Sequence, residues 1–218
     1  MSSVASANAA SYFVDRHVEE GRGGKVAFRE YGSGRNLTYG DLAGTSGRVA
    51  TALAQHGIVP EQRVAMLVLD TIEFPQIFWG ALKAGVIPVP LNTLLATSVY
   101  DAILRDSRAT TLFVSDVLYD TVAPALADNP FVKTVVVIGG AAPDGTTSYQ
   151  SFLDTADAPT VAFDAHADEV AFWLYSSGTT GQPKGVHHIH SSLKATADTY
   201  GAQVLGVRED DVVFSAAK

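Results

Sequence analysis

Residues 63–69 read Arg-Val-Ala-Met-Leu-Val-Leu, a continuous apolar run with one charged residue at its start. A strand that alternates apolar and polar residues exposes one face to water, and this run shows no such alternation. An uninterrupted apolar strand is typical of a parallel sheet that is covered on both faces. The run therefore predicts a central strand of a sheet with helices on either side.

The segment before this run carries the signals of a helix. Thr38 and Asp41 have the spacing of a capping box, in which each side chain bonds the other residue's backbone N–H. Apolar residues then recur at helical spacing. Gly57 suits the position just after a helix, and Pro60 lies beyond it. We therefore expect a helix that follows Thr38 and ends before Gly57.

Strand-like and helix-like segments alternate along the rest of the chain. Repeated strand–helix–strand spacing with buried strands predicts an α/β domain with a mainly parallel sheet and flanking helices. The expected helices are residues 71–84, 97–107, 116–127 and 191–205, and the expected strands are residues 86–91, 111–114, 133–138 and 170–175.

Three segments fall outside this alternation. The first ten residues are small and polar, so we expect a disordered tail at residues 1–10. Residues 139–168 are rich in Gly, Ala, Pro, Asp and Thr, which predicts a surface connection with a weak helix at residues 149–153. Residues 212–218 read as a strand that is just forming, so we expect the sequence to stop inside a fold.

The composition excludes several classes of protein. Of the 218 residues, 47% are apolar and 17% are charged, which is incompatible with a disordered chain. The net charge is −8 and there is no basic run, so we expect neither nucleic acid nor an anionic membrane as a partner. The absence of cysteine excludes disulfides, thiolate metal sites and a cysteine nucleophile.

Two further absences bear on location. No apolar run approaches the ~20 residues of a membrane span. The N-terminus lacks the basic start and apolar stretch of a signal peptide. We therefore expect a cytoplasmic protein.

Residues 175–185 read Tyr-Ser-Ser-Gly-Thr-Thr-Gly-Gln-Pro-Lys-Gly and follow directly on an expected strand. Glycines let the backbone approach a ligand and expose its N–H groups. Hydroxyls donate to phosphate oxygens, and the lysine adds a positive charge. This combination at the carboxyl end of a strand predicts a phosphate-binding loop.

The same residues admit two other interpretations. Gly, Ser and Thr are common in ordinary solvent loops, so a loop without a ligand remains open. The P-loop of kinases and ATPases requires a lysine followed by Ser or Thr at the start of a helix. Here Pro183 precedes Lys184, Gly185 follows it, and residues 186–189 are apolar enough for a strand. Spacing and context therefore exclude the P-loop.

Residues 176–185 resemble the signature loop of the adenylate-forming superfamily, which includes acyl- and aryl-CoA ligases, luciferases and the adenylation domains of peptide synthetases. Residues 81–92 resemble the helix–turn–strand segment that lies upstream in that family. Residues 38–42 resemble its early helix start, with Asp41 in place of the commoner Glu. Within the superfamily, the details look most like benzoate-CoA ligases at residues 92–95, 172–175 and 214–218.

The resemblance implies the N-terminal portion of the large ATP-binding domain of an aryl-CoA ligase. Such an enzyme activates benzoate or a related aromatic carboxylate, which attacks the α-phosphorus of ATP to give an acyl-adenylate and pyrophosphate. The thiol of coenzyme A then displaces AMP and forms a thioester. The implied cofactors are ATP, Mg²⁺ and coenzyme A, with Mg²⁺ neutralising charge on the phosphates.

The resemblance also assigns roles within the loop. Most of the acyl pocket, the acidic residue associated with Mg²⁺ and the catalytic lysine lie beyond residue 218 in the family order, so no catalytic residue is named here. Lys218 is not that lysine. The residues that would contact the β- and γ-phosphates are Ser176, Ser177, Gly178, Thr179, Thr180 and Lys184, and those that would let the loop close and open are Gly181 and Gly185.

His187, His188 and His190 lie close enough in sequence to suggest zinc. If the segment is a strand, alternation places His188 and His190 on one face and His187 on the other. No acidic or cysteine partner lies nearby in the sequence. Packing or capping is therefore the favoured role, and no metal site is assigned.

Three interpretations remain open. As part of an aryl-CoA ligase, the chain would use a small aromatic carboxylate, ATP and CoA, depend on the rest of its own chain, and be inactive alone. The enzyme could instead act on a fatty acid or an amino acid. A stand-alone nucleotide-binding or interaction module is an alternative of another class. A homodimer is left open in each case.

Overall fold

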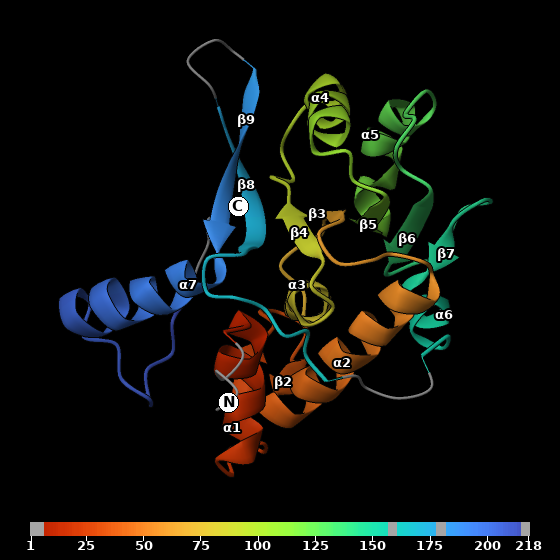
Figure 1. The fold of residues 1–218 in the computed structure, drawn as a ribbon. Coiled ribbons are helices and arrows are strands. Elements are labelled where there is room, and N and C mark those ends of the chain that lie inside the picture. Colours follow the sequence, from red (N-terminus) through yellow and green to blue (C-terminus); the bar gives the residue numbers. More distant parts are fainter. Residues whose placement is uncertain (1–6, 157–160, 178–181, 215–218) are drawn as a thin grey trace.

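A computed structural model describes residues 7–156, 161–177 and 182–214 of the chain. Its centre is a sheet of five parallel strands in the order β4-β3-β5-β6-β7 (Figure 1). This confirms the expected mainly parallel sheet. The strands are β3 (Arg63–Leu67), β4 (Ile87–Pro90), β5 (Thr111–Ser115), β6 (Thr134–Ile138) and β7 (Thr147–Ser148).

Side chains of β3 point alternately to the two faces of the sheet, and both faces are buried. Val64 and Met66 pack in the core cluster that contains Ile77, while Ala65 and Leu67 pack in a second cluster. The predicted double burial is therefore confirmed. The first face is covered by α2 (Tyr39–Gln55), α3 (Glu73–Lys83) and α6 (Tyr149–Leu153), and the second by α4 (Thr97–Ser107) and α5 (Asp116–Leu126).

The start and end of α2 follow the sequence signals. The Asp41 N–H donates to Thr38 Oγ1 at 3.1 Å, and the Thr38 N–H donates to Asp41 Oδ2 at 3.2 Å. These two bonds form the predicted capping box. Gly57 has a φ of 74°, the left-handed conformation that ends many helices and that glycine adopts without steric cost.

The expected tail at residues 1–10 is wrong for the part that the structure describes. Residues 8–10 are buried. The Asn8 side chain donates from Nδ2 to the Leu82 carbonyl at 2.8 Å and to the Phe163 carbonyl at 3.1 Å. Small side chains allow this close approach, and the amide group donates a hydrogen bond to each of the two carbonyls. Residues 1–6 lie outside the described part.

The rest of the N-terminal region consists of short elements beside α2 and α3. A π-helical turn leads into a single turn of α-helix, and an antiparallel hairpin follows (Figure 1). These elements are η1 (Ser11–Asp15), α1 (Arg16–Glu19), β1 (Val26–Arg29) and β2 (Asn36–Thr38).

The surface connection expected at residues 139–168 also needs correction, although the weak helix expected within it at residues 149–153 is confirmed as α6. Within it, β7 extends the parallel sheet by pairing with β6, and α6 packs on the sheet. The ring of Phe152 is fully buried, 5.4 Å from the ring of Phe113. Two buried apolar residues in a polar segment are a weak sequence signal. The composition alone therefore did not indicate that α6 contributes to the core.

The C-terminal part forms a separate antiparallel hairpin and a helical segment (Figure 1). The hairpin is β8 (Val170–Ser177) and β9 (Pro183–Ile189), and β8 lies beside β4. The helix expected at 191–205 is present as α7 (His190–Thr196) followed by the π-helical η2 (Ala197–Val204). The strand expected at 212–218 is absent from residues 212–214, whose side chains are exposed.

Candidate functional site

The predicted phosphate-binding loop connects β8 to β9. Gly178, Thr179, Thr180 and Gly181 lie outside the described residues. The other four predicted site residues lie in the paired strands of the hairpin. Ser177 is opposite Pro183, Ser176 is opposite Lys184, and Tyr175 is opposite Gly185.

Ser176 and Lys184 form a cross-strand pair. Directly opposite residues of an antiparallel ladder project from the same face, with their Cβ atoms about 5 Å apart. Both side chains are exposed. No acidic group in the described part of the chain pairs with Lys184. A hydroxyl donor and an unpaired ammonium group on one face of a hairpin suit an anionic oxygen ligand.

Gly185 lies on the opposite face of the hairpin, under two aromatic rings. A Cβ at this position would lie 3.3 Å from Tyr175 Cζ and 3.5 Å from Trp173 Cε3. The 3.3 Å distance is tighter than most contacts of a Cβ, so the Tyr175 ring would have to shift by a few tenths of an ångström, whereas the 3.5 Å distance is an ordinary contact. The structure thus supplies a packing reason for the glycine, in addition to the loop motion that the sequence resemblance implied.

Tyr175 and Asp106 are functional candidates that sequence reasoning did not single out. The Tyr175 hydroxyl donates to Asp106 Oδ2 at 2.5 Å. Burial raises the pKa of Tyr175, and the hydrogen bond to Asp106 raises it further, so the phenol stays protonated. The two residues are 69 positions apart in the sequence. No local signal could have indicated their contact.

The histidines of β9 pack on aromatic rings. His187 stacks on Trp173 with ring centroids 4.3 Å apart, and His188 stacks on Phe172 at 4.5 Å. His190 is buried at the start of α7, where its Nδ1 accepts the N–H of Ala9 at 3.0 Å. Within residues 7–156, 161–177 and 182–214, no three acidic or histidine side chains gather as a metal site.

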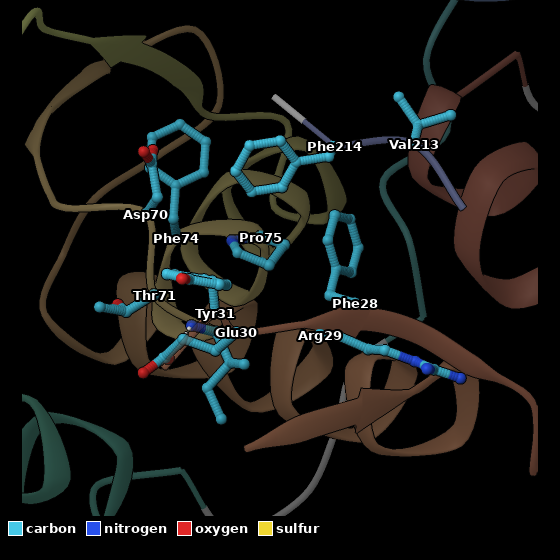
Figure 2. A pocket seen from close by; sticks show the side chains of 11 residues that line it. Phe28, Arg29, Glu30, Tyr31, Asp70, Thr71, Phe74, Pro75, Val213 and Phe214 are labelled. Atoms are coloured by element: carbon cyan, nitrogen blue, oxygen red, sulfur yellow. Dashed lines mark hydrogen bonds between the residues drawn. The ribbon is translucent and has the colours of Figure 1, made fainter. Parts of the chain in front are cut away.

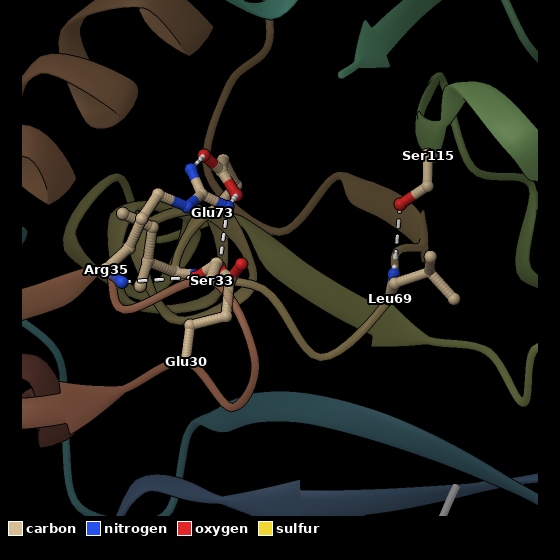
Figure 3. A network of polar contacts seen from close by, with 7 residues as sticks. Glu30, Ser33, Arg35, Leu69, Glu73 and Ser115 are labelled. Carbon is tan, nitrogen blue, oxygen red and sulfur yellow. Dashed lines mark hydrogen bonds and ion pairs between the residues drawn. The ribbon is translucent and has the colours of Figure 1, made fainter. Parts of the chain in front are cut away.

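Polar groups at the carboxyl edge of the parallel sheet bond to one another. The Leu69 N–H donates to Ser115 Oγ at 3.0 Å, between the ends of β3 and β5 (Figure 3). Asp116 accepts the N–H of Val117 at 2.8 Å and that of Gly140 at 2.7 Å. Open α/β sheets usually bind ligands at this edge. Here these groups are engaged internally, and the candidate loop belongs to the hairpin instead.

A cavity of about 320 Å³ lies beside the N-terminal hairpin. Figure 2 shows the rings of Phe28, Phe74 and Phe214 around it. None of the predicted site residues that the structure describes lines this cavity. It is therefore separate from the candidate phosphate site.

An ion-pair network next to this cavity joins the N-terminal hairpin to α3 (Figure 3). Arg35 donates to Glu73 Oε1 at 2.6 Å and to Glu30 Oε2 at 2.5 Å, and Glu30 also accepts the Ile72 N–H. Burial would raise the pKa of Glu73, but hydrogen bonding led by Arg35 outweighs it and lowers that pKa. The network has a structural role.

The parallel α/β sheet and the Ser-, Thr- and Gly-rich loop on an antiparallel hairpin define the class: the large-domain fold of adenylate-forming enzymes. Residues 14–218 match the family model of the AMP-binding enzymes, and the chain belongs to this family.

Curated relatives show which kind of AMP-binding enzyme the chain resembles most clearly. The chain is 46% identical to a 4-hydroxybenzoate–CoA/benzoate–CoA ligase of Rhodopseudomonas palustris, over 97% of this chain and 38% of that protein. It is 44% identical to a benzoate–CoA ligase of Thauera aromatica, over 97% of this chain and 39% of that protein. The chain thus spans about two-fifths of the curated relatives it matches.

A solved structure agrees with these sequence matches. The crystal structure of an anthranilate CoA ligase in complex with anthranoyl-AMP superposes with a TM-score of 0.88 at 33% identity. The match covers 94% of this chain and 39% of that chain. The fold expected from the sequence resemblance, the N-terminal part of the large adenylate-forming domain, is confirmed.

Proposed function

We propose that the whole protein is an ATP-dependent aryl-CoA ligase that activates benzoate or a related aromatic carboxylate. The observation that carries this proposal is the 46% identity to a 4-hydroxybenzoate–CoA/benzoate–CoA ligase across 97% of the chain. The reaction would form an acyl-adenylate and then a CoA thioester. Because the chain spans about two-fifths of such relatives, we expect it to be inactive when it is isolated from the rest of the protein.

The contribution of this chain is to hold the phosphates of ATP. Lys184 and Ser176 are exposed on one face of the hairpin, so they can approach the phosphates together. A cation beside the phosphates reduces the repulsion that an incoming carboxylate meets, and positioning of the two reactants lowers the barrier further. The proposed set is completed by Ser177, Gly178, Thr179, Thr180, Gly181 and Gly185.

Mg²⁺ bound with ATP would neutralise part of the phosphate charge. The described residues contain no cluster of acidic or histidine groups able to hold a metal ion. The donor set of the hairpin, a hydroxyl and an ammonium group, suits phosphate oxygens and does not suit the ion itself. We therefore assign no metal ligand to the described part of the chain.

Location and assembly are part of the same proposal. The described residues include no helix with the length and apolar character needed to cross a lipid bilayer. We propose the cytoplasm as the location, where ATP and coenzyme A are both available to the enzyme. A homodimer is the assembly to be tested, by analytical ultracentrifugation of the whole protein.

A carboxylate panel tests the proposed substrate class. In the whole protein, ATP–pyrophosphate exchange should be fastest with benzoate, 4-hydroxybenzoate or 2-aminobenzoate, and addition of CoA should yield the matching thioester. Octanoate, palmitate and phenylalanine serve as controls for the fatty-acid and amino-acid alternatives. Faster exchange with any of these controls would reject the aryl assignment, and no exchange with any acid would reject ligase activity.

A further inference from the structure

Near the candidate loop, one face of β8 packs against the rest of the domain and the other face is exposed. Trp173 and Tyr175 point to one side and pack against the core cluster under α4. Ser176, one residue further along, points to the other side, as does its partner Lys184. The face that would meet phosphate is thus the back of the face that contacts the rest of the domain.

A hydrogen bond between side chains links β8 to α4. Tyr175 donates from its hydroxyl to Asp106 Oδ2 at 2.5 Å, a short charge-assisted bond. Asp106 lies in the last turn of α4, next to the C-terminal residue Ser107. The bond therefore ties the hairpin to a helix that covers the parallel sheet.

The end of α4 is itself held in place. Arg63 of β3 donates from Nε to the Ser107 carbonyl at 2.7 Å. The same guanidinium group lies over the Trp173 ring, 5.6 Å from its centroid. Asp106 is thus presented by a helix end that is bonded to the central strand, and one arginine contacts both the helix and the hairpin.

Gly185 provides the surface against which the Tyr175 ring packs. The ring packs against the backbone at Gly185, where a Cβ would approach its Cζ to 3.3 Å. The hydroxyl end of the ring is held by Asp106 and its body by the glycine across the hairpin. Rotation of the hairpin about its long axis would break the bond to Asp106, because Asp106 belongs to α4 and not to the hairpin.

We propose that Tyr175 and Asp106 are positioning residues that orient the hairpin so that Ser176 and Lys184 face the phosphates of ATP, an inference that rests on the proposed function. Ser176 follows Tyr175 in β8, and Lys184 precedes its cross-strand partner Gly185 in β9, so each lies about 3 Å along its strand from a residue at the anchor. An anchor so close leaves little room for their displacement, and catalysis is sensitive to shifts of about 1 Å.

The test uses the whole protein and four variants. Tyr175→Phe removes the hydroxyl and keeps the ring, and Asp106→Ala removes the acceptor. We expect each to weaken MgATP binding in isothermal titration calorimetry by about tenfold. The double variant should be no worse than either single variant. Asp106→Asn keeps an acceptor oxygen and should recover most of the affinity.

A matched control and a kinetic comparison separate positioning from general damage. Tyr200 lies in η2 with 55% of its surface exposed, so Tyr200→Phe should bind MgATP like the wild type. In ATP–pyrophosphate exchange, Tyr175→Phe and Asp106→Ala should raise the KM for ATP and leave the KM for the carboxylate unchanged. Their thermal midpoints should stay close to that of the wild type.

Amide hydrogen exchange provides a readout that needs no ligand. Tyr175→Phe should speed exchange in residues 170–177 and 182–189 and leave the strands of the parallel sheet unchanged. Unchanged exchange in the hairpin, or unchanged MgATP affinity in both single variants, would overturn the inference while leaving the ligase proposal standing. A wild-type protein that fails to bind MgATP would instead overturn the proposed function, and the role in phosphate binding with it.

Discussion

Lys184 is the residue on which the phosphate-binding proposal depends most directly. It is exposed, it lies opposite Ser176, and no acidic partner in the described residues neutralises it. Its neighbour Gly185 shows that a residue next to the loop can be constrained by packing as well as by ligand binding. Adjacent positions on one strand thus serve different purposes because the pleat sends them to opposite faces.

Removal of this charge should impair adenylate formation. Lys184→Ala in the whole protein is expected to lower the rate of ATP–pyrophosphate exchange by about a hundredfold, because the phosphates lose a preorganised cation. Lys133→Ala is the matched control, since the ammonium group of that lysine donates to the Pro130 carbonyl at the surface. Equal exchange rates in the two variants would contradict the role of Lys184.

At the scale of elements, α7 meets the N-terminal segment through His190. The buried imidazole accepts the Ala9 N–H at 3.0 Å, which requires a neutral ring with its proton on Nε2. Burial lowers the pKa of His190 from its ordinary value of 6.5, although Glu169 acts in the opposite direction. The contact between these two distant segments is therefore sensitive to acid.

The pH dependence follows from the lowered pKa. Above pH 6.5 the ring is neutral in both folded and unfolded chains, so the contact contributes fully. As pH falls below 6.5, protonation favours the unfolded chain and stability declines toward the folded-state pKa. Thermal unfolding and amide exchange of residues 7–15 between about pH 5 and about pH 8 should show this decline.

Two histidine variants isolate the contribution of His190. His190→Gln should reduce the decline across this range because one titrating group is gone. Some decline should remain, because burial and Arg22 also lower the pKa of His17. His166→Gln should preserve the wild-type profile, since the His166 side chain is 72% exposed. A profile in which both variants behave alike would show that another group is responsible.

At the scale of the whole molecule, the parallel sheet has one large apolar core on each of its two faces. One core lies under α2, α3 and α6, and the other under α4 and α5. Phe152 of α6 is fully buried in the first core, where its ring lies 4.7 Å from the ring of His56. Residues 139–168 have the composition of a surface loop, but through α6 they contribute to the core of the domain that the hairpin packs against.

Truncation of Phe152 should destabilise the whole domain. Phe152→Ala is expected to lower the free energy of unfolding by about 3–5 kcal/mol, because it removes buried apolar surface and leaves a cavity. Val161→Ala, in the same segment at a site that is 90% exposed, should change it by less than about 0.5 kcal/mol. Chemical denaturation of the two variants decides whether this segment is core or connection.

Local signals account for most of the elements. The helix expected at residues 97–107 has the same bounds as α4, and the capping box of α2 is formed as its two residues predict. The burial of Phe152 and Asn8 was not predicted because each lies with a few other buried residues in a polar or small-residue neighbourhood. Burial of one residue depends on what packs over it, and local composition does not record that.

The sequence by itself determined the α/β class, most helix and strand positions, and the loop that resembles the AMP-binding family, because periodicity, caps and motifs are encoded within a few neighbouring residues. Only the tertiary structure decided that β8 pairs with β9 outside the parallel sheet and that Tyr175 reaches Asp106. Tyr175 and Asp106 are 69 positions apart in the chain, and the position of the hairpin beside β4 likewise depends on contacts with distant residues. They form where packing of the whole domain compensates the entropy of bringing the groups together.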